Sequence, residues 1–295
     1  MKILITGSNG LLGQKLVNQL SKNEKLSFLA TSQGENRNPA CPSENYCSLD
    51  ITNLDEVLKT TKAYSPDYII HTAAITNVDY CESNKSECEK VNVGGTKNLF
   101  DSAKKIGAHF LFLSTDFVFD GEVGNYKETD HPNPLSIYAE SKRDGELLLI
   151  KSNYSNWSIA RTIIVFGEGQ NLSRSNIVLW AREALAKGKP LNIIDDQFRS
   201  PTWADDLAWG CIQICKQNRK GIYHLSGPET MSIYDLVIRI GRFFKLDTSA
   251  INRTDSSSLN QPAKRPPKTG FDLSKSKKYL GYQPKTLEES LHLLS

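Results

Sequence analysis

The sequence has no long apolar run and no excess of charge of either sign. None of its apolar stretches approaches the roughly 18 residues that a membrane-spanning helix needs, and residues 1–6 are too short an apolar run for a signal peptide. Lys and Arg number 36 against 33 Asp and Glu, and aromatic residues make up 9% of the chain. Such a balance favours neither nucleic acid nor membrane as a partner. We therefore expect a cytoplasmic protein that binds neither.

The chain also lacks cysteine pairs. Its six cysteines are scattered, with no C-x-x-C pair and no Cys/His grouping at zinc spacing. Cys211 and Cys215 fall four residues apart in an expected helix, and small buried apolar residues explain them better than ligands do. We predict free thiols in a reducing compartment and no metal site.

Short apolar runs alternate with amphipathic stretches through the first half of the chain. This order is typical of an α/β fold, a Rossmann-type doubly wound parallel sheet with crossover helices. The predicted strands are residues 2–6, 26–31, 68–72, 109–114 and 158–162. The predicted helices are residues 11–22, 54–62, 88–106 and 137–151.

The alternation becomes less regular after about Gly167. Helical patterns at 176–187, 204–217 and 232–244 are separated by short strands and by a polar segment, 248–269. We predict a dinucleotide-binding domain over residues 1–165 and a smaller C-terminal α/β substrate lobe over 166–295, with the chain crossing between them. The Ser-rich run 255–259 and the Pro-rich run 262–267 indicate a mobile or substrate-covering loop.

A glycine-rich turn follows the first predicted strand directly. The spacing is G-x-x-G-x-x-G and a predicted helix comes next, so close backbone approach and a helix N-terminus are offered to a pyrophosphate. An ordinary turn would also use glycine, but the place of this motif between a predicted strand and a predicted helix favours a dinucleotide site. The predicted cofactor residues of this turn are Gly7, Asn9, Gly10, Leu11, Leu12 and Gly13.

The end of the second predicted strand carries no carboxylate to bind a ribose 2′-hydroxyl. Ser32 and Arg37 lie there instead and could hold a 2′-phosphate, which favours NADPH and leaves NADH possible. A solvated loop arginine is the alternative for Arg37. Asp50, with Ile51 beside it, is placed to receive the adenine amino group, or else to cap a helix.

Tyr138 and Lys142 lie four residues apart, which places a phenol and an ammonium on one helix face. A neighbouring cation is expected to lower the pKa of a tyrosine from about 10 towards the range useful for proton transfer. Thr115 ends a buried strand shortly before that helix, where parallel sheets form their ligand crevice. It can hold a substrate oxygen beside Tyr138, with a helix-capping role as the alternative.

With these motifs the chain resembles the extended short-chain dehydrogenase/reductase superfamily, and within it the dTDP-4-dehydrorhamnose reductase family, over nearly its whole length. The motifs that carry the resemblance are Gly7 to Gly13, residues 71–79 (HTAAITNVD), Val91-Asn92, residues 114–121 (STDFVFDG), Tyr138 to Lys142, residues 199–202 (RSPT), residues 205–208 (DDLA), and residues 264–267 (KRPP) with Phe271-Asp272.

The resemblance implies a catalytic triad and its surroundings. Thr115, Tyr138 and Lys142 would form the triad, with Tyr138 donating a proton while hydride passes from NADPH to a C4 ketone. Ala73, Ala74, Ile75 and Thr76 would lie beside the nicotinamide, and Asn92 would support the active-site helix. The residues that the resemblance places around the sugar nucleotide are Thr76, Val78, Thr115, Asp116, Phe117 and Ile164, with Arg199 and Arg265 as candidates for its pyrophosphate.

Two of these positions depart from the family pattern. The reductases usually have Tyr where Phe117 stands and often Trp where Ile164 stands, so the hexose and its nucleotide carrier are left open. Two other functions stay open as well: an epimerase or dehydratase that recycles bound NAD, and a non-catalytic NADP-binding regulatory subunit like the relative that regulates methionine adenosyltransferase. We expect a monomer or a homodimer.

Overall fold

The computed structural model describes residues 1–294, and its centre is a seven-stranded sheet in which every neighbouring pair is parallel. This confirms the predicted α/β Rossmann-type class. In spatial order the strands are β11 (Gly221–His224), β6 (Trp157–Thr162), β5 (His109–Thr115), β4 (Tyr68–His71), β1 (Lys2–Thr6), β2 (Ser27–Ser32) and β3 (Tyr46–Ser48).

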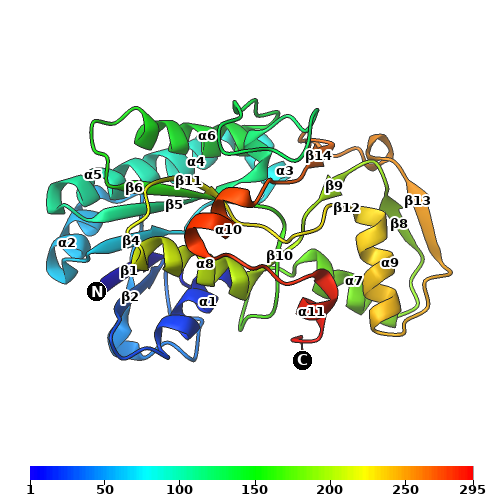
Figure 1. Cartoon of the computed structure of the whole chain (residues 1–295), viewed down its shortest axis with the longest axis horizontal. Helices are drawn as coiled ribbons and strands as arrows, with labels where there is room; N and C mark the ends of the chain where they lie inside the picture. Colours follow the sequence, from blue (N-terminus) through cyan, green and yellow to red (C-terminus); the bar gives the residue numbers. More distant parts are fainter. Residues whose placement is uncertain (295) are drawn as a thin grey trace.

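Helices cover both faces of this sheet (Figure 1). Successive strand residues point to opposite faces, so Ile3 and Ile5 enter one apolar cluster and Leu4 enters the other. On the first face lie α1 (Leu11–Leu20), α8 (Ala204–Lys216) and α10 (Ser274–Leu280). On the second lie α2 (Leu54–Tyr64), α5 (Thr96–Ile106) and α6 (Ile137–Ile150), with α3 (Val78–Ser83) and α4 (Lys85–Glu89) packed against α6.

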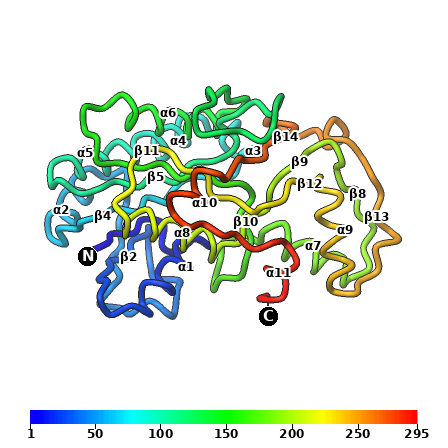
Figure 2. Tube along the Cα trace, viewed as in Figure 1, coloured from blue at the N-terminus to red at the C-terminus, as the bar shows by residue number. Residues whose placement is uncertain are grey.

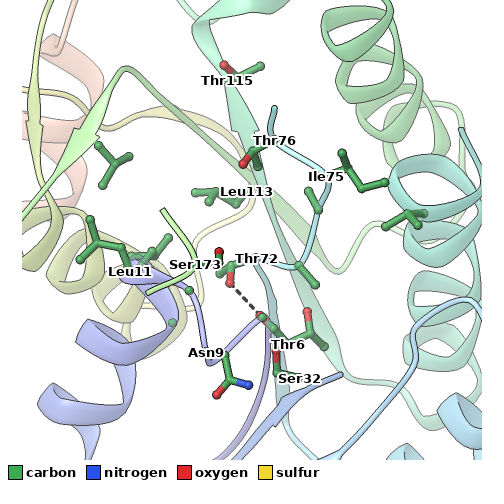
Figure 3. A pocket seen from close by; sticks show the side chains of 18 of the residues that line it. Thr6, Asn9, Leu11, Ser32, Thr72, Ile75, Thr76, Leu113, Thr115 and Ser173 are labelled. Atoms are coloured by element: carbon green, nitrogen blue, oxygen red, sulfur yellow. Dashed lines mark hydrogen bonds between the residues drawn. The ribbon is translucent and has the colours of Figure 1, made fainter. Parts of the chain in front are cut away.

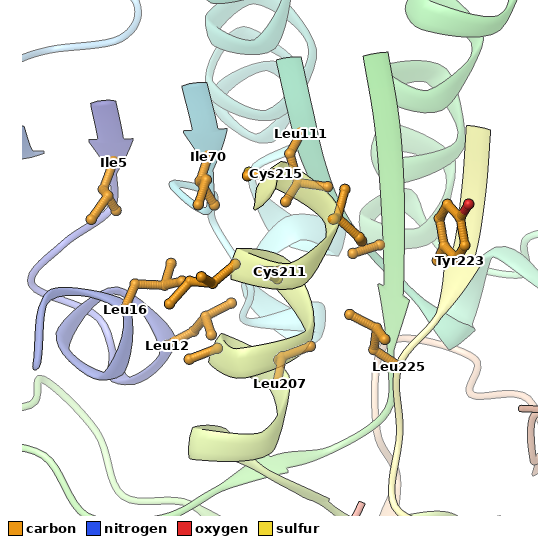
Figure 4. Close-up of a cluster of buried hydrophobic side chains, with 14 of the residues drawn as sticks. Ile5, Leu12, Leu16, Ile70, Leu111, Leu207, Cys211, Cys215, Tyr223 and Leu225 are labelled. Carbon is orange, nitrogen blue, oxygen red and sulfur yellow. The ribbon is translucent and has the colours of Figure 1, made fainter. Parts of the chain in front are cut away.

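Helix α8 comes from the second half of the chain but packs beside α1. Figure 4 shows its residues Leu207, Cys211 and Cys215 directed into the cluster that Ile5 and Ile70 enter from the sheet. Both cysteines are fully buried and all six cysteines of the chain are free thiols, in agreement with the prediction. The following strand, β11, then joins the edge of the sheet beside β6. The chain thus crosses back into the first lobe after residue 203.

A third apolar cluster holds the smaller lobe together, on the right of Figure 1. Its three helices are α7 (Ile177–Ala186), α9 (Ile233–Phe243) and α11 (Leu287–Leu291). Its strands pair as β8 (Leu191–Ile194) with β13 (Ile251–Thr254), β7 (Val165–Phe166) with β10 (Thr202–Trp203), and β9 (Phe198–Arg199) with β12 (Met231–Ser232) and β14 (Lys268–Thr269). Figure 2 shows β8 and β13 side by side although they are far apart along the chain.

Three local features differ from the sequence prediction. Strands β3 and β11 had not been assigned to the parallel sheet, and the single helix predicted over 88–106 consists of α4, a π-helical segment η2 (Lys90–Gly95) and α5. The polar segment 248–269 contains β13, a 3₁₀ turn η4 (Ser256–Leu259) and β14, so much of it is regular structure. Two further 3₁₀ turns are η1 (Ser43–Asn45) and η3 (Asp116–Val118).

No helix within the described residues is long and apolar enough to cross a membrane.

Candidate active site

A pocket of about 880 Å³ opens at the carboxyl ends of the parallel strands and continues to the second lobe (Figure 3). Crevices of α/β folds lie at this end of the sheet. Most of the residues singled out in the sequence line it: Gly7, Asn9, Gly10, Leu11, Leu12, Gly13, Ser32, Arg37, Asp50, Ile51, Ala73, Ala74, Thr76, Val78, Thr115, Asp116, Phe117, Tyr138, Lys142 and Ile164. The pocket does not include Asn92, Arg199 or Arg265.

Two glycines of the turn have no room for a side chain. Gly7 has a φ of +75°, and a Cβ atom there would lie 2.7 Å from the amide nitrogen of Ala73. A Cβ atom on Gly13 would lie 2.3 Å from the carbonyl oxygen of Gly7. Gly10 is the N-cap of α1 and brings no side chain to its first turn, so the amide end of that helix is left to the pocket. These features fit a dinucleotide pyrophosphate, which binds backbone N–H groups at a helix N-terminus.

The far end of the pocket contains the residues expected at an adenosine. The Asn9 side chain donates to the Glu35 carbonyl and accepts from the Arg37 amide, both at 2.8 Å, and so fixes the loop that carries Arg37. Asp50 accepts bonds from the amide and the hydroxyl of Thr52, each at 2.8 Å, with one carboxylate oxygen. The N-cap of α2 is Asn53 and not Asp50, so the capping alternative does not hold for Asp50 at that helix.

Helix α6 brings Tyr138 and Lys142 to the other end of the pocket. Its N-cap Ser136 accepts a bond from the Ala139 amide, which starts the helix just before the tyrosine. Both side chains are buried, and the Lys142 ammonium lies 4.1 Å from the centre of the Phe112 ring. Burial lowers the pKa of Lys142 to about 7.

The pKa of Tyr138 departs from the sequence argument. The Lys142 cation was expected to lower it, but burial of the phenol raises the pKa of Tyr138 above its ordinary value. A hydrogen bond with Thr115 and the charge of Arg174 oppose that rise without cancelling it. The lysine that was to supply the charge is itself desolvated. The environment of the protein alone therefore keeps Tyr138 protonated, which is the form that a general acid requires.

Thr115 is held by a buried carboxylate. Its hydroxyl donates to Asp116 at 3.0 Å, and the hydroxyl of Thr269 in β14 donates to the other oxygen of the same carboxylate. The Arg199 Nε lies 3.8 Å from that carboxylate. Burial raises the pKa of Asp116, and the Arg199 charge opposes the rise. Both lobes thus contribute to the position of Thr115.

Arg199 does not reach the pocket, and its predicted contact with a pyrophosphate is not supported. Its guanidinium is 2% exposed and donates to the carbonyl groups of Phe198, Pro266 and Pro267 and to the Gln197 side chain. With Asp116 at the Nε, every part of the guanidinium has a protein partner. Arg199 therefore joins the lobes and has no donor free for a ligand.

Arg265 and Asn92 also serve as internal contacts. Arg265 pairs with Asp79 at 2.7 Å, which holds the Pro-rich run against α3. Asn92 lies in the π-helical segment, accepts from the Ile75 amide at 2.8 Å, and donates to the Ile75 carbonyl and to Ser141 of α6. It thereby connects the strand-end segment of the pocket to the catalytic helix, and π-helical segments often occur at such sites.

Sequence reasoning missed several lining residues. Residues 172–177 of the second lobe border the pocket, among them Arg174, and the Ser114 hydroxyl is buried there without a hydrogen-bond partner. Ile164 has a φ of +28°, a strained value for a β-branched residue. A Ser-Arg-Ser-Asn run before a predicted helix was the available signal for Arg174.

A family model described as "RmlD substrate binding domain" matches residues 1–294. The chain belongs to this family. The resemblance seen in the motifs is thus confirmed, and the extended short-chain dehydrogenase/reductase fold with it. In this RmlD-type chain the pocket residues that match the family motifs are those of the glycine turn, the ends of β4 and β5, and α6.

Three relatives illustrate the range of the family. A dTDP-4-dehydrorhamnose reductase of Aggregatibacter actinomycetemcomitans is 33% identical and covers 98% of this chain and 97% of its own. The crystal structure of a dTDP-4-dehydrorhamnose reductase of Bacillus anthracis, in complex with NADP, superimposes with a TM-score of 0.85 at 26% identity, covering 99% and 98%. The methionine adenosyltransferase 2 subunit beta of Rattus norvegicus is 30% identical over 93% of this chain and 81% of its own.

Proposed function

We propose that the protein reduces the C4 ketone of a nucleotide-linked deoxysugar with NADPH, in the manner of a dTDP-4-dehydrorhamnose reductase. One observation carries this proposal: Thr115, Tyr138 and Lys142 line one end of the pocket whose other end is the glycine turn. The 33% identical reductase supports the same reaction. We also infer a cytoplasmic location, a monomeric or homodimeric state, and a division between cofactor and substrate domains near residue 165.

Each residue of the triad has its own role in the proposed reduction. The glycine turn Gly7 to Gly13 would hold NADPH, which would supply the hydride for the carbonyl carbon. Tyr138 donates its proton to the carbonyl oxygen, so that an alcohol results and a phenolate is left to be reprotonated. Lys142, four residues along the same helix, stabilises that phenolate. Thr115 donates its own proton to Asp116 and, as the N-cap of η3, accepts from the Phe117 amide at 3.3 Å. Its second lone pair is left to accept a bond from Tyr138 or from the product hydroxyl.

The preference for NADPH has two supports. The related reductase of Bacillus anthracis was crystallised with NADP. In this chain Ser32 and Arg37 line the adenosine end of the pocket, and no carboxylate stands at the end of β2 to bind a free 2′-hydroxyl. A guanidinium and a hydroxyl can both donate to a 2′-phosphate.

A substrate panel tests the reaction. The loss of nicotinamide absorbance is followed with NADPH or NADH, and the panel contains a dTDP-4-keto-6-deoxyhexose, its UDP counterpart and free ketones. We expect turnover with a nucleotide-linked sugar and none with free ketones, with NADPH preferred. NADPH binding without turnover of any nucleotide-linked 4-keto sugar would contradict the proposal.

The resemblance to the methionine adenosyltransferase subunit favours one second candidate, a regulatory NADP-binding subunit. It predicts a stable complex with a methionine adenosyltransferase and a change in the kinetics of that enzyme. A binding titration with the purified catalytic subunit of that enzyme discriminates between the two functions, because the reductase hypothesis predicts that the two proteins form no complex. The solved epimerases and dehydratases are 20–22% identical, which shows the shared fold alone.

A further inference from the structure

Three cations line the pocket within the part of the chain that the structure describes: Arg37, Lys142 and Arg174. Arg37 lies with Ser32 at the adenosine end, and Lys142 is buried beside Tyr138. Arg174 differs from both because it belongs to the second lobe, in the loop between β7 and α7, whereas Arg37 and Lys142 belong to the first. It is therefore the pocket cation placed for the substrate half.

The guanidinium of Arg174 crosses the pocket to the first lobe. One of its terminal nitrogens donates to the hydroxyl of Thr76, with the Thr76 carbonyl 3.5 Å away. No carboxylate among residues 1–294 forms an ion pair with it. An arginine has five N–H donors in a planar fork, so most of this fork has no protein acceptor. A neutral hydroxyl is a weak partner that an anion can replace.

The surroundings of Arg174 suit an anion. Ser173 and Ser175 flank it and line the pocket with hydroxyl groups, and Figure 3 shows Ser173 near the middle of the pocket. Asn176 is the N-cap of α7 and lines the pocket together with Ile177, so the positive end of a ten-residue helix faces the same space. The side chain of Asn176 bonds the Leu179 amide and the Gly167 carbonyl, which fixes this helix start.

We propose that Arg174 binds the diphosphate of the nucleotide-linked substrate, exchanging its contact with Thr76 for the phosphate oxygens. This inference rests on the proposed function, and it replaces Arg199 and Arg265 as the diphosphate residue. The dinucleotide also carries a diphosphate, but the glycine turn and α1 provide for that group. Thr76 lies instead on the segment expected beside the nicotinamide and the sugar, so Arg174 stands at the substrate end.

Calorimetric binding of dTDP and of thymidine tests the inference without turnover. The variants are Arg174→Gln and Arg174→Lys, and the matched control is Arg242→Gln, an exposed arginine on α9. We expect Arg174→Gln to raise the Kd of dTDP by about 10- to 100-fold, the loss of a charge-assisted bidentate contact. Arg174→Lys should recover part of this loss. The Kd values of thymidine and of NADPH should change less than about twofold, because thymidine has no diphosphate and the diphosphate of NADPH is assigned to the glycine turn.

Several outcomes would overturn the inference. The first is dTDP binding to Arg174→Gln with the affinity of the control variant. A second is an equal loss for thymidine and dTDP, which would mean a change of pocket shape. A third is a loss confined to NADPH, which would assign the guanidinium to the dinucleotide. The experiment separates this inference from the proposed reaction, because a protein that bound dTDP through Arg174 but reduced no ketone would retain the inference and lose the reaction.

Discussion

Two helices direct their amino-terminal ends at the same pocket, and the two ends differ in construction. At α1 the glycines present backbone to the pocket beside the side chains of Asn9 and Leu11. Gly7 and Gly13 have no space for a Cβ atom, and the N-cap Gly10 adds no side chain. At α7 the wall is made of side chains, with Arg174 exposed between two serines. The shape of the α1 end is therefore set by the backbone, whereas the shape of the α7 end can be changed by substituting side chains.

This difference separates what the family shares from what each member selects. Backbone N–H groups at a helix N-terminus bind a pyrophosphate, which all these dinucleotide cofactors have in common. A surface made of side chains can change its ligand without a change of fold, and Phe117 and Ile164 line this half of the pocket. We expect substitutions at the side-chain end to change turnover and substrate binding, and substitutions at the glycine end to change cofactor binding.

The largest expected effect comes from Tyr138 of α6, which lines the substrate half of the pocket together with the α7 end. Tyr138→Phe removes the proton donor but keeps the ring that packs in a T-shaped contact with Phe117. We expect kcat to fall by roughly 10²- to 10⁴-fold, the usual contribution of a general acid, with the Kd of NADPH within about twofold of the unchanged protein. Steady-state kinetics with the preferred keto sugar measures the first value and fluorescence titration the second. Tyr279→Phe, on an exposed tyrosine, is the control.

Full turnover by Tyr138→Phe would mean that another group donates the proton, and it would remove the basis of the proposed function.

A smaller effect is expected from a substitution that distorts the glycine turn. Gly13→Ala places a Cβ atom 2.3 Å from the Gly7 carbonyl oxygen, so the turn must shift. Overpacking of this kind costs about 1 to 3 kcal/mol, and we expect the Kd of NADPH to rise by about 10- to 100-fold. Gly94→Ala is the matched control, because its Cβ would meet nothing closer than 4.0 Å. Equal NADPH affinity of the two variants would show that the turn is not the pyrophosphate site.

The single cation at the glycine end provides a finer comparison. Arg37→Gln should weaken NADPH binding by about tenfold, the loss of one charge-assisted hydrogen bond to a 2′-phosphate, and should leave NADH binding unchanged. The measurement is the ratio of the two KM values, with Arg242→Gln as control. If both cofactors lose affinity equally, the guanidinium contacts a group that they share and the preference has another source.

The sequence predicted best where local pattern and final environment agree. The strand at 2–6, the glycine turn and the helix at 137–151 all form within one or two residues of the prediction, because each has a strong apolar period and a clear start signal. Strands β3 and β11 have only three and four residues, too few for a period, and β11 exists through its pairing with the distant β6. The π-helical segment keeps the apolar spacing of a helix, so the pattern alone did not reveal it.

Site residues divided in the same way. Tyr138, Lys142 and the glycines were predicted from their spacing along the chain, and the structure places all of them on one pocket. Arg199 was misplaced because its partners, Asp116 and the carbonyl groups of Pro266 and Pro267, lie far away along the chain and consume its donors. Arg174 was missed because nothing in its own segment shows that the second lobe closes over Thr76.

The smallest expected effect concerns the free energy of unfolding that is lost by burying Lys142 of α6. Lys142 has its pKa lowered to about 7 by burial, against 10.5 when unfolded, so the unfolded chain holds the extra proton between these values. Stability from this group is therefore lowest below pH 7 and rises as pH increases from 7 to 10.5. Lys142→Met removes the buried charge, and we expect a gain of about 1 kcal/mol, or roughly 2 to 3 °C in Tm, with turnover lost.

The sign of the pH dependence makes this prediction specific. The gain of Lys142→Met in Tm should be larger at pH 6 than at pH 9, because the unchanged protein carries the buried ammonium only at the lower pH. Lys59→Met, on an exposed lysine of α2, should show no such trend. A loss of Tm at pH 6 would mean that the ring of Phe112, 4.1 Å away, and the carboxylate of Glu146 repay the desolvation of the ammonium. In that case the catalytic end would be as well stabilised as the glycine end, and the contrast between them would be one of recognition alone.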